Sequence, residues 1–315
     1  MSYENLPTPK SIPKEFLRRR LHSLAGLFFV LFLFEHMLTN SEAALLVGKD
    51  GSGFIAMVNL IHSIPYLPLV EIFLLAVPIA IHVYLGIIYL YEAKTNSWPT
   101  DGSKPALPSF ARNHAFTWQR ITSLVLVIGL LAHVINMRFM HHPKQVGSSY
   151  AVEVEADRGL VSLAPRLQTQ LITPRSKEHL LQPKVEKKDP SLPPTIQAEQ
   201  CYEIQNENEQ IEFIETTSPT KDQWIAVAPD FGTAALLLVR ENFRTLWICI
   251  LYTIFVLAAS FHAANGLWTF AICWGIALNE QSRKIVRLIS TGLGFMLASG
   301  GLACIWLTYW VNLRN

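Results

Sequence analysis

The chain has 315 residues, of which 50% are hydrophobic and 16% are charged, and its formal net charge is +2. Such a composition is typical of proteins that cross a membrane several times, and it excludes an ordinary soluble domain. The near-neutral charge, with no basic patch interleaved with aromatic residues, argues against a nucleic-acid partner.

Five apolar stretches are each long enough to cross a bilayer. They contain roughly 18 to 26 mostly apolar residues, against the ~20 that a helix needs to span the hydrocarbon core. In chain order they are Leu21–Leu38, Pro65–Leu90, Ile121–Phe139, Leu246–Trp268 and Ile285–Val311. The sequence therefore predicts an all-α membrane protein, a bundle of five transmembrane helices. The first stretch is longer than the apolar core of a signal peptide, so we interpret it as an uncleaved helix.

Positively charged residues indicate the orientation of these helices. Lysines and arginines gather before the first stretch, between the second and third, and between the fourth and fifth. They are Lys14, Arg18, Arg19, Arg20, Lys94, Lys104, Arg112, Arg120, Arg283, Lys284 and Arg287. On the opposite side, the short loop after the first stretch carries only Lys49, and the carboxyl end carries Arg314. The charges of the long segment between the third and fourth stretches count little, because long loops cross the membrane largely regardless of charge. Because cytoplasmic loops are enriched in lysine and arginine, the amino terminus and these two connections are predicted to be cytoplasmic.

The predicted organisation has three parts. Residues 1–140 hold helices one to three, residues 141–240 form a polar extracytoplasmic insertion, and residues 241–315 hold helices four and five. Within the insertion, Lys184–Pro194 has the composition of a linker, and Gln210–Glu215 alternates like a strand. We find no catalytic constellation there. The four cysteines, including Cys201, form no C-x-x-C motif, which argues against structural zinc and covalently attached haem.

Four of the ten histidines lie inside predicted membrane helices, where ionisable side chains are costly and functional by default. Their depths follow from the helical rise of ~1.5 Å per residue. His36 and His133 lie ~22 and ~21 Å from the cytoplasmic ends of their helices. His82 and His262 lie only ~13 and ~10 Å from that side. The histidines therefore form an outer pair, His36 with His133, and an inner pair, His82 with His262.

This pairing suits two haem b groups, because a bis-histidine haem needs two imidazoles at one depth on opposing helices. Two other interpretations stay open. A histidine in a membrane helix often has a packing or hydrogen-bonding role, and a transition metal could use the same side chains. A metal site usually adds carboxylates or thiolates at that depth, and Glu35 points about 100° away from His36 on a helix. The depth pairing therefore favours haem.

Several sequence blocks resemble the cytochrome b558 subunit of bacterial succinate dehydrogenase, a di-haem, five-helix membrane anchor. The most specific block is Phe261–Trp268 (F-H-A-A-N-G-L-W), continuing to Trp274-Gly275, which is similar to the fourth helix of that family. The other blocks are Arg19–Leu24, Glu35-His36, Ser63–Tyr66, Leu69–Phe73 with His82, and Gln119–Thr122 with His133. The resemblance covers all five spans, but the outer insertion is far longer than the corresponding connection in typical members.

The resemblance implies ligands and partners. It assigns His82 and His262 to the haem nearer the cytoplasmic iron–sulfur subunit, and His36 and His133 to the distal haem. It also implies a flavoprotein subunit that carries FAD and oxidises succinate, as in the tricarboxylic acid cycle, and an iron–sulfur subunit. The anchor would then pass electrons to a quinone, with menaquinone expected, in the cytoplasmic membrane of a bacterium.

Further candidates lie at the two membrane interfaces. The residues at the cytoplasmic interface are Arg19, Arg20, His22, Ser23, Trp118 and Arg120. They suit the anionic propionates of the inner haem, although positive-inside anchors and interfacial aromatics would have the same placement. His62 stands before Ser63, at a position that is often acidic in the family, so proton uptake for quinone reduction is assigned to His62 or Glu71. Both remain quinone candidates.

The predicted role is electron transfer within an oxidoreductase complex, with the catalysis of succinate oxidation left to other subunits. Bis-histidine haem is coordinatively closed, and the chain has no dinucleotide fingerprint, nucleophile elbow or cluster cysteines. The first alternative is the anchor of a fumarate reductase, which runs the same steps backwards. An alternative from another class is a non-haem transporter or sensor whose histidines are structural.

Overall fold

The computed structural model describes residues 12–44, 49–94, 96–103, 106–174, 209–213 and 223–314. It divides into two compact units. Unit 1 comprises Met1–Met37, Tyr66–Gly129 and Phe255–Ser299. Unit 2 comprises Leu38–Pro65, Leu130–Ile254 and Gly300–Asn315.

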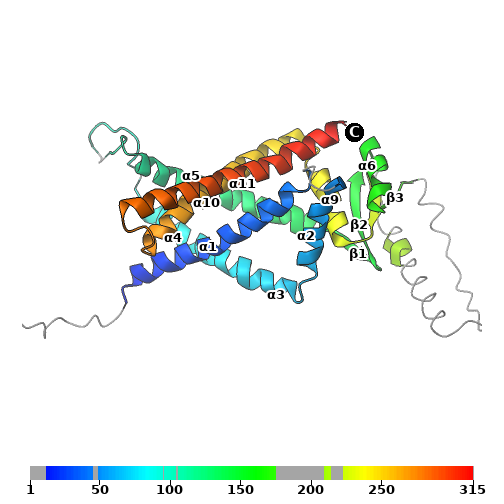
Figure 1. Ribbon diagram of the computed structural model, residues 1–315, viewed down its shortest axis with the longest axis horizontal. Coiled ribbons are helices and arrows are strands. Elements are labelled where there is room, and N and C mark those ends of the chain that lie inside the picture. The colour runs from blue at the N-terminus through cyan, green and yellow to red at the C-terminus, as the bar shows by residue number, and fades with distance from the viewer. Residues whose placement is uncertain are drawn as a thin grey trace, which may run out of the picture. The chain divides into compact units, whose positions relative to one another are not determined.

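In the described part of the chain, five helices are long and apolar enough to cross a membrane (Figure 1). The candidate spans are Lys14–Ser41, Leu67–Glu92, Ala111–Met140, Leu246–Cys273 and Glu280–Leu313. In order, they correspond to α1 (Lys14–Ser41), α3 (Leu67–Glu71) with η3 (Ile72–Ala76) and α4 (Val77–Glu92), α5 (Ala111–Val134) with η4 (Ile135–Met140), α10 (Leu246–Cys273), and α11 (Glu280–Arg314). The expected all-α membrane class is confirmed.

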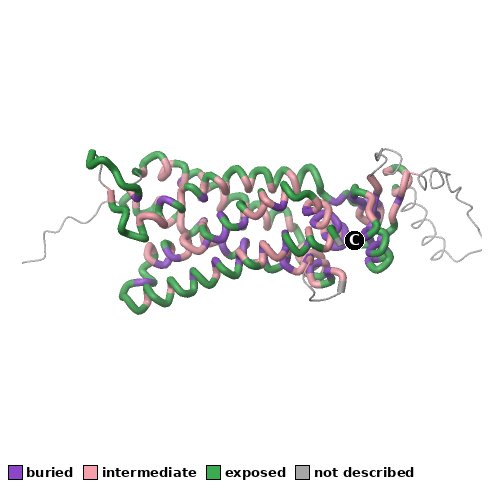
Figure 2. The backbone as a smooth tube through the Cα atoms, turned by 90° about the horizontal axis from the view of Figure 1, so that it is seen from above, coloured by how far each residue is buried: buried purple, intermediate pink, exposed green. Residues whose placement is uncertain are grey.

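The spans expose many large apolar side chains and bury several small ones. Phe73, Leu288 and Phe295 are 67%, 75% and 73% exposed, whereas Ala25 and Ala258 are only 5% exposed. Figure 2 shows exposed residues recurring along the helices. Lipid tails are as apolar as leucine, so membrane helices associate through close packing of small residues instead of through hydrophobic burial. This pattern is the one that a bilayer environment favours.

Unit 2 contains a four-stranded antiparallel sheet of order β1-β2-β4-β3. Its strands are β1 (Lys144–Val146), β2 (Ser149–Glu155), β3 (Gln170–Ile172) and β4 (Gln223–Ala228). Tyr150 pairs with Ala228, and Ile172 pairs with Ile225, so β4 lies between two strands that precede it by tens of residues. The short helices of this unit are η2 (Lys49–Gly51), α2 (Ser52–His62), α6 (Arg158–Leu163), η5 (Ala164–Leu167) and α9 (Phe231–Asn242).

Helix α9 packs against strands β2 and β4 and against helix α2. Its first turn is capped by Asp230, whose carboxylate accepts a hydrogen bond of 2.8 Å from the backbone N–H of Thr233. Asn59 of α2 donates to Asp230 at 2.7 Å and accepts from the N–H of Gly232 at 2.7 Å. A Cβ atom on Gly232 would lie 2.5 Å from the carbonyl oxygen of Ile55. Only glycine therefore allows this close approach of α9 to α2.

The polar insertion differs from its sequence prediction. Residues 210–213 of the predicted strand Gln210–Glu215 are helical, so the strand prediction is wrong there. Phe213 packs against the apolar face formed by Val146, Ala151, Ile172, Ile225 and Val227. The four-stranded sheet was not predicted from the sequence. Lys184–Pro194, the predicted linker, and Cys201 lie outside the described residues.

Candidate functional site

A cavity of about 90 Å³ lies within unit 1, between helices α1, α4, α5 and α10. Its polar lining includes His22, Ser23, His82, Gln119 and His262. The remaining lining is mostly apolar, and the glycines Gly26 and Gly266 contribute to it. The cavity therefore brings together both histidines of the predicted inner pair.

The ring centres of His82 and His262 are 6.1 Å apart, and the ring planes make an angle of 77°. A bond from a metal to an imidazole nitrogen is about 2 Å long, and that nitrogen lies about 1.1 Å from the ring centre. Two axial imidazoles on one metal ion therefore place their ring centres roughly 6 Å apart. The separation between His82 and His262 fits this requirement.

The hydrogen bonds of these two rings favour ligation through Nε2. His82 Nδ1 lies 3.0 Å from the carbonyl oxygen of His22, which can only accept, so Nδ1 carries the proton. His262 Nδ1 lies 3.3 Å from Thr122 Oγ1. That hydroxyl donates to the carbonyl oxygen of Trp118 at 2.8 Å, so it is left to accept from His262. Such bonds fix the tautomer and ring orientation of metal-binding histidines.

Two neighbours on α1 determine the position of His82. The ring of His22 stacks on that of His82 with centres 4.1 Å apart and planes 15° from parallel. A Cβ atom on Gly26 would lie 2.8 Å from Cε1 of His82. The absence of a side chain at Gly26 therefore allows the His82 ring to lie close to the α1 backbone.

Gln119 of α5 connects the start of one span to α10. Its amide nitrogen donates to the carbonyl oxygen of His262 at 3.2 Å, and its amide oxygen accepts from Asn265 at 2.9 Å. Gln119 and Thr122 belong to a sequence block that resembles the family, but their role was not predicted from the sequence. Their spacing of three residues, which places both on one face of a helix, was the available signal.

The other inner candidates do not line this cavity, except His22 and Ser23. Arg19 forms an ion pair of 2.9 Å with Glu15. The Arg20 guanidinium lies 3.7 Å from the centre of the Phe16 ring, and Trp118 is 48% exposed. Arg120 stacks on Phe116, and its Nη2 is buried with no hydrogen-bond partner among the described residues. Ser23 accepts a hydrogen bond of 3.0 Å from the indole of Trp274.

The outer candidates lie in different surroundings. His36 belongs to unit 1, where its ring centre is 5.3 Å from that of Phe32. His133 belongs to unit 2, and its Nδ1 is 3.1 Å from the phenol oxygen of Tyr252.

The quinone candidates are also separated. His62, at the end of α2, stacks on Phe231 of α9 at 4.1 Å between ring centres. The Tyr150 hydroxyl is 3.3 Å from His62 Nε2. The insertion therefore supplies both partners of His62. Glu71 ends α3 and does not line the cavity between the histidines.

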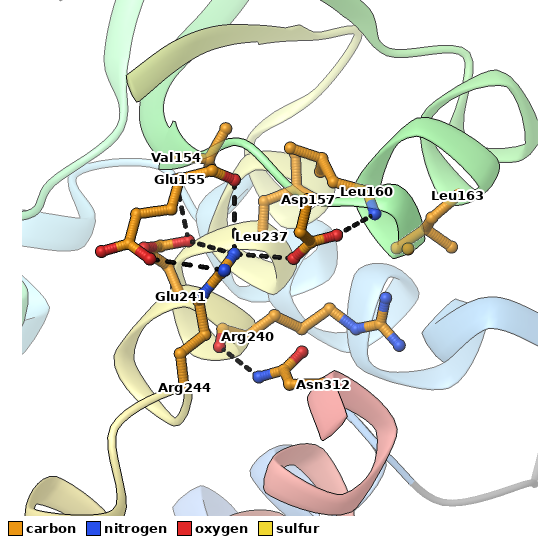
Figure 3. Close-up of a pocket in the computed structure, with 11 residues that line it drawn as sticks. Val154, Glu155, Asp157, Leu160, Leu163, Leu237, Arg240, Glu241, Arg244 and Asn312 are labelled. Carbon is orange, nitrogen blue, oxygen red and sulfur yellow. Dashed lines mark hydrogen bonds and ion pairs between the residues drawn. The ribbon is translucent and has the colours of Figure 1, made fainter. Parts of the chain in front are cut away.

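A second, smaller cavity of about 20 Å³ lies in unit 2, next to a cluster of charged residues (Figure 3). Arg244 pairs with Asp157 at 2.6 Å, with Glu155 at 3.3 Å and with Glu241 at 3.7 Å. Burial raises the pKa of Glu241, although Arg244 opposes this effect. A cavity of this size holds about one water molecule. We therefore interpret the cluster as structural.

The chain is similar to one characterised membrane subunit across nearly its whole length. It is 22% identical over 294 residues to the succinate dehydrogenase cytochrome b558 subunit of Bacillus subtilis (strain 168). This chain is a distant homologue of that subunit. The alignment covers 93% of this chain and 96% of the Bacillus protein. No protein-family model and no solved structure matches the chain.

Proposed function

We propose that the chain is a cytochrome b558-type membrane anchor of a succinate:quinone oxidoreductase, with two haem b groups that relay electrons to quinone. The observation that carries the proposal is the separation of 6.1 Å between the ring centres of His82 and His262 within one cavity. The distant similarity to a succinate dehydrogenase subunit supports the same conclusion independently.

The donor set of the inner cavity fits a haem with two axial imidazoles. His82 and His262 would be the ligands, each through Nε2, because both Nδ1 atoms are engaged with oxygen acceptors. A bis-imidazole haem, when bound, carries one electron and leaves no open position for oxygen. The apolar lining of the cavity limits the access of water, and solvent access is one determinant of redox potential.

The outer pair, His36 with His133, is proposed as the second ligand set on the strength of the depth estimate from the sequence.

Anionic propionates need cationic or hydrogen-bonding partners. Among the candidates Arg19, Arg20, His22, Ser23, Trp118 and Arg120, Arg120 has the strongest support. Its buried Nη2 lacks a partner within the described residues, and an anionic group would satisfy it.

The proposed partners are a flavoprotein with FAD and an iron–sulfur protein, both on the cytoplasmic side, and a quinone, with menaquinone favoured. The proposed location is the cytoplasmic membrane of a bacterium, with a cytoplasmic amino terminus. His62 and Glu71 remain the proposed sites for proton uptake. The contact of His62 with Tyr150 supports a role in which its proton exchanges with a hydroxyl group.

A spectrum of the purified membrane protein tests the proposal. We expect a b-type α-band on reduction and two haems per chain by quantitative extraction. A chain that binds no haem would contradict the proposal and would favour a transporter or sensor with structural histidines. Purification from native membranes should also yield the two peripheral subunits, and the purified complex should reduce a menaquinone analogue with succinate.

A further inference from the structure

His133 takes part in a polar network that no sequence argument identified. Its Nδ1 is 3.1 Å from the hydroxyl of Tyr252 on α10, and the two rings meet edge to face with centres 5.8 Å apart. In a histidine that binds iron through Nε2, Nδ1 carries the proton, so the phenol oxygen accepts it. Tyr252 is therefore in position to fix the tautomer and the orientation of the His133 ring.

Tyr252 is itself held by the residue that follows α9. The ring of Phe243 packs edge-on against Tyr252, with centres 5.2 Å apart. Next to Phe243, Asn242 accepts a hydrogen bond of 2.8 Å from Asn136, which lies one helical turn after His133. These contacts tie the surroundings of Tyr252 and His133 to the end of α9.

Phe243 directly follows α9, which begins within the polar insertion and lies outside the membrane spans. Its position is fixed by packing. Leu236 and Leu237 of α9 are 1% and 2% exposed, and Phe243 is 6% exposed. The next residue, Arg244, forms its ion pairs with three carboxylates. The sheet, α9 and this cluster together determine where the Phe243 ring lies.

We propose that Tyr252 is a positioning residue for the ligand His133, and that the polar insertion holds it in place through α9 and Phe243. The inference rests on the proposed function, in which His133 binds the iron of the outer haem. A hydrogen bond from Nδ1 to an acceptor raises the basicity of a ligating imidazole, which stabilises the oxidised metal. The insertion, whose role the sequence leaves open, thereby acts on the electron relay without binding substrate.

The test is a redox titration of both haems in Tyr252→Phe, with Tyr84→Phe as the matched control. Tyr84 is 65% exposed on α4, and its hydroxyl has no part in the network. We expect Tyr252→Phe to keep two haems and to raise the potential of the outer haem. The expected change is up to about tenfold in the iron(III)/iron(II) equilibrium, or about 59 mV for one electron. The inner haem and Tyr84→Phe should titrate like the unaltered protein.

A second variant keeps the inference testable if Tyr252→Phe does not assemble. Phe243→Leu leaves the phenol in place but removes the ring that packs on it, so the potential of the outer haem should shift in the same direction by a smaller amount. Selective loss of the outer haem in either variant also supports the inference. Two bound haems with unchanged potentials and unchanged low-spin electron paramagnetic resonance signals would overturn it, while the proposed function would stand. Equal effects on both haems would also contradict it.

Discussion

The inner and outer histidines differ in what holds them. His82 and His262 direct Nδ1 at a backbone carbonyl of α1 and at the hydroxyl of Thr122, both within membrane spans. His133 directs Nδ1 at Tyr252, which packs against Phe243 at the end of α9. The acceptor for the Nδ1 proton thus comes from the membrane spans themselves in unit 1. In unit 2 it is the Tyr252 hydroxyl, whose position depends on the insertion. Changes in the insertion should therefore affect only the outer site.

The largest expected effect comes from Gly26→Ala. The added methyl would lie 2.8 Å from Cε1 of His82, so the ring must leave its position. We expect the inner haem to be lost or bound roughly 10- to 100-fold more weakly, the range typical of disturbed ligand positioning, while the outer haem stays. Gly292→Ala is the control, because nothing lies within 4 Å of a Cβ atom at that position. Haem content and difference spectra measure the result, and retention of both haems in Gly26→Ala would contradict it.

A moderate effect is expected from Thr122→Val, which keeps the shape of the side chain but removes the acceptor for His262 Nδ1. The potential of the inner haem should rise, because the imidazole becomes a weaker donor to the iron. The iron(III)/iron(II) equilibrium should shift several-fold toward iron(II). Thr122→Ser restores a hydroxyl and should restore the potential. A shift confined to the outer haem would contradict the assignment of His262 to the inner site.

A stability effect is expected from Asp230→Ala, which removes the cap of α9 and the acceptor for Asn59. Loss of a helix cap costs about 1 to 2 kcal/mol. Hydrogen exchange should accelerate in β2, β4 and α9, which belong to unit 2. Asp230→Asn keeps an acceptor oxygen and should retain most of the protection. Unchanged exchange in Asp230→Ala would show that the cap does not support this unit.

The smallest expected effect is a pH dependence from Glu241. Burial raises its pKa above the ordinary value of 4.5, so the folded state binds this proton more tightly than the unfolded state. Its contribution to stability is therefore present below pH 4.5 and is lost as the pH rises through the raised pKa. Arg244, Glu155 and Asp157 are the charged groups that face it.

Glu241→Gln should flatten this part of the stability profile while it preserves the acceptor for the backbone N–H of Glu155. Thermal unfolding of unit 2, followed by hydrogen exchange at several pH values, measures the change. An identical pH profile in Glu241→Gln would assign the pH dependence to other groups.

The sequence predicted the membrane spans well because their signal is local. Leu246–Trp268 and Ile285–Val311 lie inside α10 and α11, and α11 begins earlier because the polar residues before Ile285 are helical as well. The sheet was missed because its pairing is not local. Ala151 pairs with Val227, far along the chain, and the last four residues of β4 are all buried, so that strand shows no alternation of apolar and polar residues.

The candidate site was predicted in part for a related physical reason. The helical rise per residue predicts the depth of a side chain but not which neighbouring helix it faces. The sequence therefore indicated that His82 and His262 lie at one depth, but it did not predict their tautomers or their neighbours. Gly26 and Tyr252 were missed, because a glycine contact and a phenol acceptor depend on which helix faces which. No local pattern carries that information.

The central claim is that His82 and His262 together bind one of two haems. Haem content per chain in purified His82→Tyr tests it most directly. We expect one haem per chain in this variant and two in the unaltered protein. His262→Tyr should lose the same haem. Two haems in His82→Tyr, or loss of different haems in the two variants, would contradict it.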